Sequence, residues 1–580
     1  MRHWPLASLL LMMALPAAAA IKVELRGVED DVKRNVETFL SVARYRDRND
    51  IDADTVNRLF NRIDGEVREA LRPFGYYEPT VKSQLDKHEK GWQIDIEVTP
   101  GEPVRVRHVS IEVVGQGADD PAFESIRSQR ALREGMRLNH GTYEAVKGDL
   151  IRAAASNGYL AAKLVDNPLL VDVANHSASI DLKIETGPRY RFGAIDIKQS
   201  VIRPTLMSRY LRFKEGDPYN VEQLLRTQFA LDDSLYFSTV EVAPGEPDAQ
   251  TLTVPIAITA TKNDRQLSLG GGYGTDTSFR GTIAWTDTRI NDRGHRLRLE
   301  LKASQITRRF DARYDIPIGD PALERFSLQA LNKFEELGSL NTNVTSVTPS
   351  ITHVRGRWQV VTQVAATRTT TDYGPTQQRS NLLVPGITLA SVPEGFLGES
   401  LFSRALYVEL IGSQKALGSD SDFIRLLVQS EKQIDLSRKW HLLLRGELGT
   451  SLVKNFSELP AIYRFFAGGD RSVRGFGYQT LSPEALVTDP ATGQTDLKDV
   501  GGKHLIVGSV EFVRDIPWNL AVATFFDIGN AFDHFGDKLQ YAGGIGLRYR
   551  LPVVSLGVDV AKPLSTGGGL RLHLNITPKL

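Results

Sequence analysis

The C-terminal end of the chain alternates strictly between apolar and polar residues. From Leu570 to Thr577 the sequence reads LRLHLNIT, with an apolar residue at every even position. Because successive side chains of a strand point to opposite faces, this pattern predicts a β-strand with one apolar and one polar face. A single such strand could form the edge of a soluble sheet. Similar segments recur back to about residue 265, and in a secreted chain that repetition is typical of an outer-membrane barrel.

The alternating segments of residues 265–580 predict an antiparallel transmembrane β-barrel. In segment 297–302, for example, leucines occupy the odd positions and charged residues the even ones. The segments are roughly ten residues long, which is enough for a tilted strand to cross a bilayer. There are about sixteen of them, and single-chain bacterial barrels have even strand numbers. We therefore predict α+β repeats, described below, followed by a 16-stranded barrel.

The first twenty residues have the composition of a secretory signal peptide. A basic start at Arg2 and His3 precedes an apolar segment, and Ala18 to Ala20 provide small residues for cleavage. We therefore expect residues 1–20 to be removed on export. The mature chain has no cysteine, which excludes disulfides and thiolate metal sites. Its 70 basic and 70 acidic residues argue against a nucleic-acid partner.

Three repeats precede the predicted barrel, at residues 21–102, 103–188 and 189–262. Each reads strand, helix, helix, strand, strand, and each has aromatic residues after its second helix, as in GYY, GYL and LYF. The layout resembles the polypeptide-transport-associated (POTRA) domain. That resemblance implies that the repeats receive extended chains by adding a strand to a sheet edge. The alternative is three α+β spacers without a ligand.

A long loop in the barrel carries the segment RFFAGGDRSVRGFGY, from Arg464 to Tyr478. It resembles the signature FxxGG…(V/I)RG(F/Y) of the superfamily that contains BamA, TamA and the two-partner secretion transporters. We expect this loop to fold into the barrel and call residues 463–478 the lid. The residues that carry the resemblance are Gly468, Gly469, Val473, Arg474, Gly475 and Phe476.

Two carboxylates on the strands after the lid are candidate partners for Arg474. Counting alternate residues places Glu511 and Asp527 on the inner face of neighbouring strands. Two such carboxylates repel each other unless a cation lies between them, and a forked guanidinium can bond to both. We therefore expect Arg474 to hold the lid inside the barrel. The alternative is an exposed loop arginine with solvated acids in the barrel wall.

Glycines flank both terminal strands of the predicted barrel, where closure would join them. Because glycine weakens strands and specifies register poorly, this seam is expected to separate more readily than other strand pairs. The resemblance implies that the seam is a lateral gate towards lipid. We also expect Gly271 to face a residue of the last strand such as Leu572. A tight corner in a rigid barrel is the alternative. The seam residues are Leu269, Gly270, Gly271, Gly272, Gly569, Leu570 and Leu572.

The number of repeats, the length and the ending TPKL resemble the TamA family most. This implies an outer-membrane insertase with its POTRA domains in the periplasm, which assembles autotransporters and other β-barrel proteins. Its implied partners are a TamB-like, inner-membrane-anchored protein bound through the first POTRA domain, unfolded outer-membrane proteins and outer-membrane lipid. The resemblance implies no cofactor, no metal and no enzymatic activity.

Two other functions fit the same pattern. A two-partner secretion transporter would export one large protein instead of inserting barrels, and a passive pore would only conduct small solutes. The sequence has no GxSxG, HExxH or Walker motif, so no catalytic motif helps to choose between the insertase, the transporter and the pore.

Overall fold

The computed structural model describes most of the mature chain. The predicted signal peptide, residues 1–20, lies outside the described residues, which are 21–28, 30–46, 51–88, 91–128, 131–166, 168–373, 377–391, 406–488, 495–551 and 554–578. Across these ranges no helix has both the length and the apolar character needed to cross a membrane. The chain forms two compact units. One comprises the residues up to Asp196 with 213–225 and 243–257; the other comprises 197–212, 226–242 and 258–580.

The first repeat folds as a three-stranded sheet covered by helices. Strand β1 is parallel to β3, and β2 completes the sheet in the order β1-β3-β2. Apolar side chains at alternate positions of β3, such as Ile94 and Ile96, pack against Val67 and Leu71 of α3 to form the core. The elements are β1 (Ile21–Arg26), α1 (Asp30–Phe39), α2 (Ala53–Phe60), α3 (Ile63–Leu71), β2 (Thr80–His88) and β3 (Gly91–Thr99).

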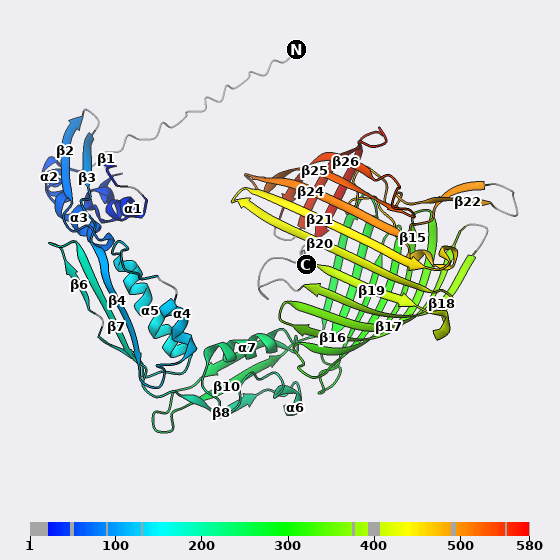
Figure 1. The fold of residues 1–580 in the computed structure, drawn as a ribbon, viewed down its shortest axis with the longest axis horizontal. Helices are drawn as coiled ribbons and strands as arrows, with labels where there is room; N and C mark the ends of the chain where they lie inside the picture. The colour runs from blue at the N-terminus through cyan, green and yellow to red at the C-terminus, as the bar shows by residue number, and fades with distance from the viewer. Residues whose placement is uncertain are drawn as a thin grey trace, which may run out of the picture. The chain divides into compact units, whose positions relative to one another are not determined.

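The second repeat has the predicted order of elements, except that the strand after its second helix is divided into β5 and β6. Helix α5 begins where the Asn139 side chain accepts a bond from the Thr142 amide, and it lies along the sheet (Figure 1). The core joins Ile180 and Leu182 of β7 to Leu150 of α5. The elements are β4 (Arg105–Val114), α4 (Pro121–Ser128), α5 (His140–Ser156), β5 (Lys163–Asp166), β6 (Leu169–Asp172) and β7 (Ser177–Glu185).

The third repeat forms a sheet in the order β8-β10-β9. Asn220 precedes its longer helix, and its side chain accepts a bond from the Gln223 amide, as expected of an N-cap. The elements are β8 (Arg191–Lys198), α6 (Pro204–Met207), α7 (Val221–Asp232), β9 (Phe237–Pro244) and β10 (Thr253–Lys262).

Sixteen antiparallel strands then close into a barrel, as predicted (Figure 1). The loop after β21 adds a small hairpin of β22 (Glu484–Thr488) and β23 (Thr495–Asp499), which lies outside the barrel sheet. The barrel strands are β11 (Gln266–Gly274), β12 (Ser278–Asp287), β13 (Arg296–Ala303), β14 (Thr307–Pro317), β15 (Glu324–Leu337), β16 (Leu340–Arg355), β17 (Trp358–Asp372), β18 (Gln377–Ser391), β19 (Tyr407–Ser413), β20 (Phe423–Ser437), β21 (Trp440–Val453), β24 (His504–Ile516), β25 (Leu520–Phe532), β26 (Gln540–Arg550), β27 (Val554–Pro563) and β28 (Arg571–Pro578).

The two faces of the barrel differ in polarity. Outward positions such as Leu301, Ile424 and Ile545 are exposed and apolar, whereas inward positions such as Glu300 and Asp311 are buried and charged. This is the reverse of a soluble protein, and it suits strands whose outer face contacts lipid. Closure also pairs backbone groups that an open sheet would leave without partners.

One rim of the barrel carries part of the third repeat. The Tyr236 hydroxyl donates to the carbonyl of Gly294 at 2.7 Å, in the β12–β13 turn. Arg209 donates to the carbonyl of Gly319 at 2.6 Å, in the β14–β15 turn. The turns after β11 and β13 and the long loop after β21 therefore lie at the opposite rim.

The seam between β11 and β28 is short. Among the described residues, two register pairs join the strands, Tyr273 with Ile576 and Gly274 with Asn575, and the Thr275 amide donates to the Leu574 carbonyl at 3.0 Å. By contrast, β11 pairs with β12 along its whole length. The expected pairing of Gly271 with Leu572 is wrong, because continuing the observed register would place Gly271 opposite Pro578. Gly272 still allows close approach, since a Cβ there would lie 2.7 Å from the Ile576 carbonyl oxygen.

We expect the amide protons of β11 to exchange in two classes. Alternate amides point to β12 and to the seam, so about half of those between Gln266 and Gly272 lack a strand partner. In hydrogen–deuterium exchange, these should exchange fast, while β25, which is paired on both sides, stays protected. Equal protection of β11 and β25 would show that the seam is closed along its length.

Candidate functional site

The lid lies inside the barrel and is tied down at its base. The Phe465 amide donates to Gly502 at 2.9 Å and the Ala467 amide to Leu481 at 3.0 Å, which brings the two arms of the loop together. Arg464, almost fully buried, donates to the carbonyls of Leu459 and Val500. These bonds hold the first residues of the lid in place, and the residues that contact the barrel wall follow them in the chain.

Arg474 is the most strongly bonded side chain of the lid. Its Nε donates to Asp527 at 2.7 Å and its Nη1 to Glu511 at 2.7 Å, while its backbone amide donates to Asp527 at 3.1 Å. The guanidinium carbon lies 3.4 Å from the ring centroid of Phe525. Burial lowers the pKa of Arg474, but its bonds to Asp527 and Glu511 outweigh burial and raise it. The side chain therefore stays cationic between the two carboxylates.

A second arginine extends this cluster. Arg548 on β26 donates to Glu511 at 3.1 Å and to Asp559 at 3.0 Å, and Asp559 lies 3.5 Å from Arg474. Two arginines thus bond to three carboxylates, the buried Glu511 on β24 and Asp527 on β25 and the partly buried Asp559 on β27. We did not predict Arg548 or Asp559. The signal was present, since Asp559 occupies an inward position of a strand whose outward positions are Val558 and Val560.

The glycines of the lid are required by its path. Gly475 has a φ of +92°, and a Cβ there would lie 3.2 Å from the Cβ of Ala542 in the wall. Gly468 has a φ of +100°, and a Cβ there would lie 2.3 Å from the carbonyl oxygen of Gly477. Val473 is fully buried, and Phe476 packs against the same apolar cluster. The motif therefore combines tight turns with an apolar anchor.

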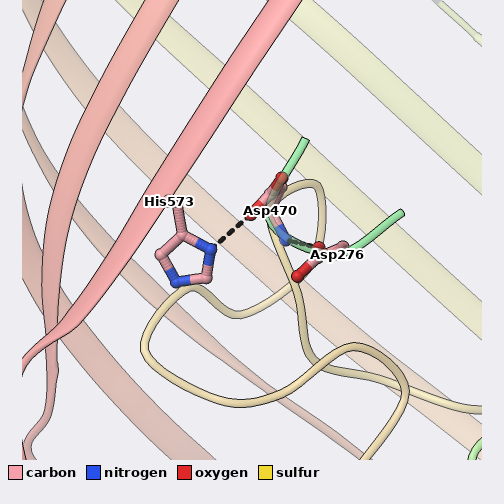
Figure 2. Close-up of side chains that lie close together, drawn as sticks. All are labelled: Asp276, Asp470 and His573. Atoms are coloured by element: carbon pink, nitrogen blue, oxygen red, sulfur yellow. Dashed lines mark hydrogen bonds and ion pairs between the residues drawn. The ribbon is translucent and has the colours of Figure 1, made fainter. Parts of the chain in front are cut away.

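The lid also contacts both strands of the seam through a group that we did not predict (Figure 2). The Asp470 amide donates to Asp276, in the turn after β11, and the Asp470 carboxylate accepts from Thr275 at 3.3 Å. On the other side of the seam, His573 of β28 bonds to the same Asp470 carboxylate. We call Asp276, Asp470 and His573 the seam triad.

The seam triad is arranged for hydrogen bonding rather than for a metal ion. Its ligand atoms lie within 4.8 Å of one another, as a metal site would require. However, the Gly475 amide donates to Nε2 of His573 at 3.0 Å, so Nε2 must be the unprotonated nitrogen. Nδ1 then carries the proton and donates it to Asp470, which leaves no lone pair on His573 for a cation. His573 thus links the lid to β28 twice.

The predicted seam residues do not all meet. Leu269, Gly270 and Gly271 lie on β11 beyond the pairs with β28, and Leu572 pairs with Val560 of β27. Gly569 and Leu570 precede the first residue of β28. The lid and seam therefore form one site, in which two strand pairs, the hydrogen bonds between Thr275 and Leu574, and the seam triad join β11 to β28.

Comparison with known proteins places the barrel in a family. A profile described as "Omp85 superfamily domain" matches residues 262–576, one described as "POTRA domain TamA domain 1" matches residues 22–100, and one described as "Surface antigen variable number repeat" matches residues 190–262.

Two curated relatives are outer membrane protein assembly factors named BamA. That of Nitratidesulfovibrio vulgaris is 27% identical over 27% of this chain and 20% of its own length. That of Neorickettsia risticii is 21% identical over 77% of this chain and 62% of its own length. The chain thus spans less than two thirds of either relative. The fold also resembles the crystal structure of Haemophilus ducreyi BamA lacking POTRA domains 1–3, with a TM-score of 0.64, 15% identity, and coverage of 82% of this chain and 99% of that one.

Replacing Arg474 with alanine is expected to release the lid. Removing one partner of a buried ion pair costs about 3–5 kcal/mol, because the other charges stay buried without a counterion. Hydrogen exchange should therefore rise sharply for the amides of residues 470–478. The matched control is Arg471→Ala in the same loop, since Arg471 is exposed and forms no ion pair with the described residues. Equal exchange in both variants would contradict the role of Arg474.

The lid is also expected to loosen as the pH rises. Burial raises the pKa of Asp276 to about 6, and repulsion from Asp470 adds to this rise, although the Asp470 amide and His573 oppose it. When the lid is open, the pKa of Asp276 would return to its ordinary value of 3.8. Closing the lid therefore favours the protonated form of Asp276. The closed lid is most stable below about pH 4, and it loses stability as the pH rises through about 6.

A spin label at position 471 can measure this change. Its mobility should increase between about pH 4 and about pH 7 in the otherwise unchanged protein. Asp276→Asn keeps an oxygen that can accept the Asp470 amide but cannot ionise, so its mobility profile should be flat over that range. A pH response of the same size in Asp276→Asn would show that another group controls the lid.

Proposed function

Since the chain belongs to the Omp85 superfamily, we propose that it is an outer-membrane insertase that assembles β-barrel proteins, autotransporters among them, through its seam. The observation that carries this proposal is the short joint between β11 and β28, with two strand pairs where the neighbouring junction of β11 with β12 has nine. The similarity to BamA assembly factors supports the same class of function.

The free edge of β11 explains how a substrate strand would be received. Within the part of the chain that the structure describes, its seam-facing amides and carbonyls have no strand partner from Gln266 to Gly272. Unpaired backbone groups cost several kcal/mol each in lipid, so an incoming strand that pairs with them gains that energy. An exposed strand edge is also a general template for strand addition. Folding and burial of the substrate would drive insertion, so the proposal requires no cofactor, no metal and no enzymatic step.

The lid would control access to that edge. With the lid in place, Asp470 holds the turn after β11 and His573 of β28 at the same carboxylate. Moving the lid would break these bonds and leave the two strand pairs and the hydrogen bonds between Thr275 and Leu574 as the joint. Arg474 would therefore act on the seam at a distance, through the position of the lid.

The remaining parts of the chain suit the same role. The apolar outer face of the barrel supports a location in the outer membrane, with the POTRA domains in the periplasm. The match of residues 22–100 to a TamA-type first domain supports a TamB-like, inner-membrane-anchored partner bound through that domain. Unfolded outer-membrane proteins are the proposed substrates, and outer-membrane lipid is the medium that receives them.

A disulfide across the seam tests this function directly. The chain has no cysteine of its own, and Tyr273 and Ile576 are register partners, so their cysteine variants lie within disulfide reach. Oxidised Tyr273→Cys/Ile576→Cys protein in liposomes should no longer insert an autotransporter β-domain. Reduction should restore insertion.

The matched control locks a junction that is already closed. Leu547 and Val558 are outward register partners on β26 and β27, so Leu547→Cys/Val558→Cys should insert the substrate in both redox states. Full insertion by the oxidised seam variant would overturn the proposal. A secretion transporter would instead leave the substrate soluble inside the vesicles, and a passive pore would show steady conductance that the seam disulfide does not change.

A further inference from the structure

An apolar hollow opens on the outer face of the barrel beside the free edge of β11. Its volume is about 630 Å³, within the range of pockets that hold drug-sized ligands. Outward side chains of four successive strands form its apolar walls, and all are substantially exposed: Leu269, Ile283, Leu301 and Phe310.

The hollow exists because small residues occupy one row of the sheet. Gly271, Gly281 and Ala303 are successive register partners on β11, β12 and β13, and Ala303 pairs next with Arg308 of β14. Where neighbouring rows carry leucine, isoleucine or phenylalanine, this row leaves space. A Cβ at Gly281 would meet no atom within 4 Å, which shows that the space is open.

One arginine supplies the charge on the outward face of the hollow. Arg308 shares the outward face with Phe310, whereas the other two cations of the lining, Lys302 and Arg309, occupy inward positions, and the lining contains no acidic residue. Lys302 pairs with Glu300 at 2.8 Å and Arg309 with Asp311 at 3.0 Å. Arg308 forms no ion pair with any residue that the structure describes, and its guanidinium instead lies 5.7 Å from the centroid of the Phe334 ring.

Arg308 also lies at the level of the barrel where a lipid headgroup would be found. It is the second residue of β14, next to the turn at the rim opposite the third repeat. At that height an outward arginine can reach the interface, while the apolar walls extend from it towards the middle of the strands.

We propose that this hollow binds one molecule of an anionic, phosphate-bearing lipid. An acyl chain would occupy the apolar walls between Leu269 and Phe310, and the phosphate would pair with Arg308. The inference rests on the membrane location in the proposed function, but it adds a lipid site that the insertase mechanism does not require. Because Leu269 belongs to β11, the bound lipid would lie against the strand that forms the free edge.

A second hollow provides a matched control. It has a similar volume, about 620 Å³, and lies on β18 to β21 away from the seam. Its cation, Lys454, pairs with Asp422 at 3.4 Å, and that acid lines the same hollow. Neutralising Lys454 should therefore not change the preference for anionic lipid.

Native mass spectrometry of the full mature protein in detergent can measure this preference. The probes are phosphatidylglycerol, which is anionic, and phosphatidylcholine, which is zwitterionic. We expect the wild-type protein and Lys454→Gln to retain phosphatidylglycerol preferentially. In Arg308→Gln the preference should fall about fivefold, the contribution of one interfacial cation. Gly281→Leu should lower retention of both lipids, because its side chain fills the hollow without a clash.

The outcome is independent of substrate insertion. Equal preference in the wild type and Arg308→Gln, or no preference in the wild type, would overturn the lipid site and leave the insertase proposal intact. Displacement of the lipid by inorganic phosphate alone would also overturn it, because the apolar walls would then contribute nothing. Migration of unheated samples in electrophoresis verifies that each variant retains a folded barrel.

Discussion

The buried ion cluster around Arg474 determines the arrangement of the barrel interior. One loop guanidinium bonds to Asp527 and Glu511, and Arg548 bonds to Glu511 and Asp559. The inward carboxylates on β24, β25 and β27 would repel each other without these cations. The cluster therefore stabilises the strands that follow the lid as well as the lid itself. Because the lid then reaches His573 and Asp276, the position of one arginine influences the joint between the first and last strands.

The cluster and the seam have opposite physical characters. Around Arg474, the carboxylates of Asp527 and Glu511 are buried, so a released lid would leave these charges without Arg474 as their counterion. At the seam, two strand pairs and a few polar bonds join β28 to the glycine-rich strand β11, which keeps a free edge. A strongly held lid can therefore be coupled to a weak joint, and a change at the lid is transmitted through Asp470. This coupling is of the hydrogen-bonded kind, which a change of one side chain can alter.

Much of this arrangement could be predicted from the sequence, because strand faces follow a period of two. Alternation placed Glu511 and Asp527 on the inner face and led to a count of sixteen strands. The partners of strands far apart in sequence were harder to predict. The register of β11 with β28 depends on barrel closure, which no local pattern encodes, so the expected pairing of Gly271 with Leu572 was wrong. The roles of Asp470 and His573 were missed for the same reason, since they are about one hundred residues apart in the chain.

The central claim is that the lid holds the seam, and the distance across the seam tests it most directly. Spin labels at Leu269 on β11 and Leu572 on β28, both exposed positions, report this distance by pulsed electron–electron double resonance. The account predicts a single narrow distribution when Arg474 is present, and a broader one extending to longer distances in Arg474→Ala. An identical distribution in the two proteins would contradict it, because the seam would then be independent of the lid.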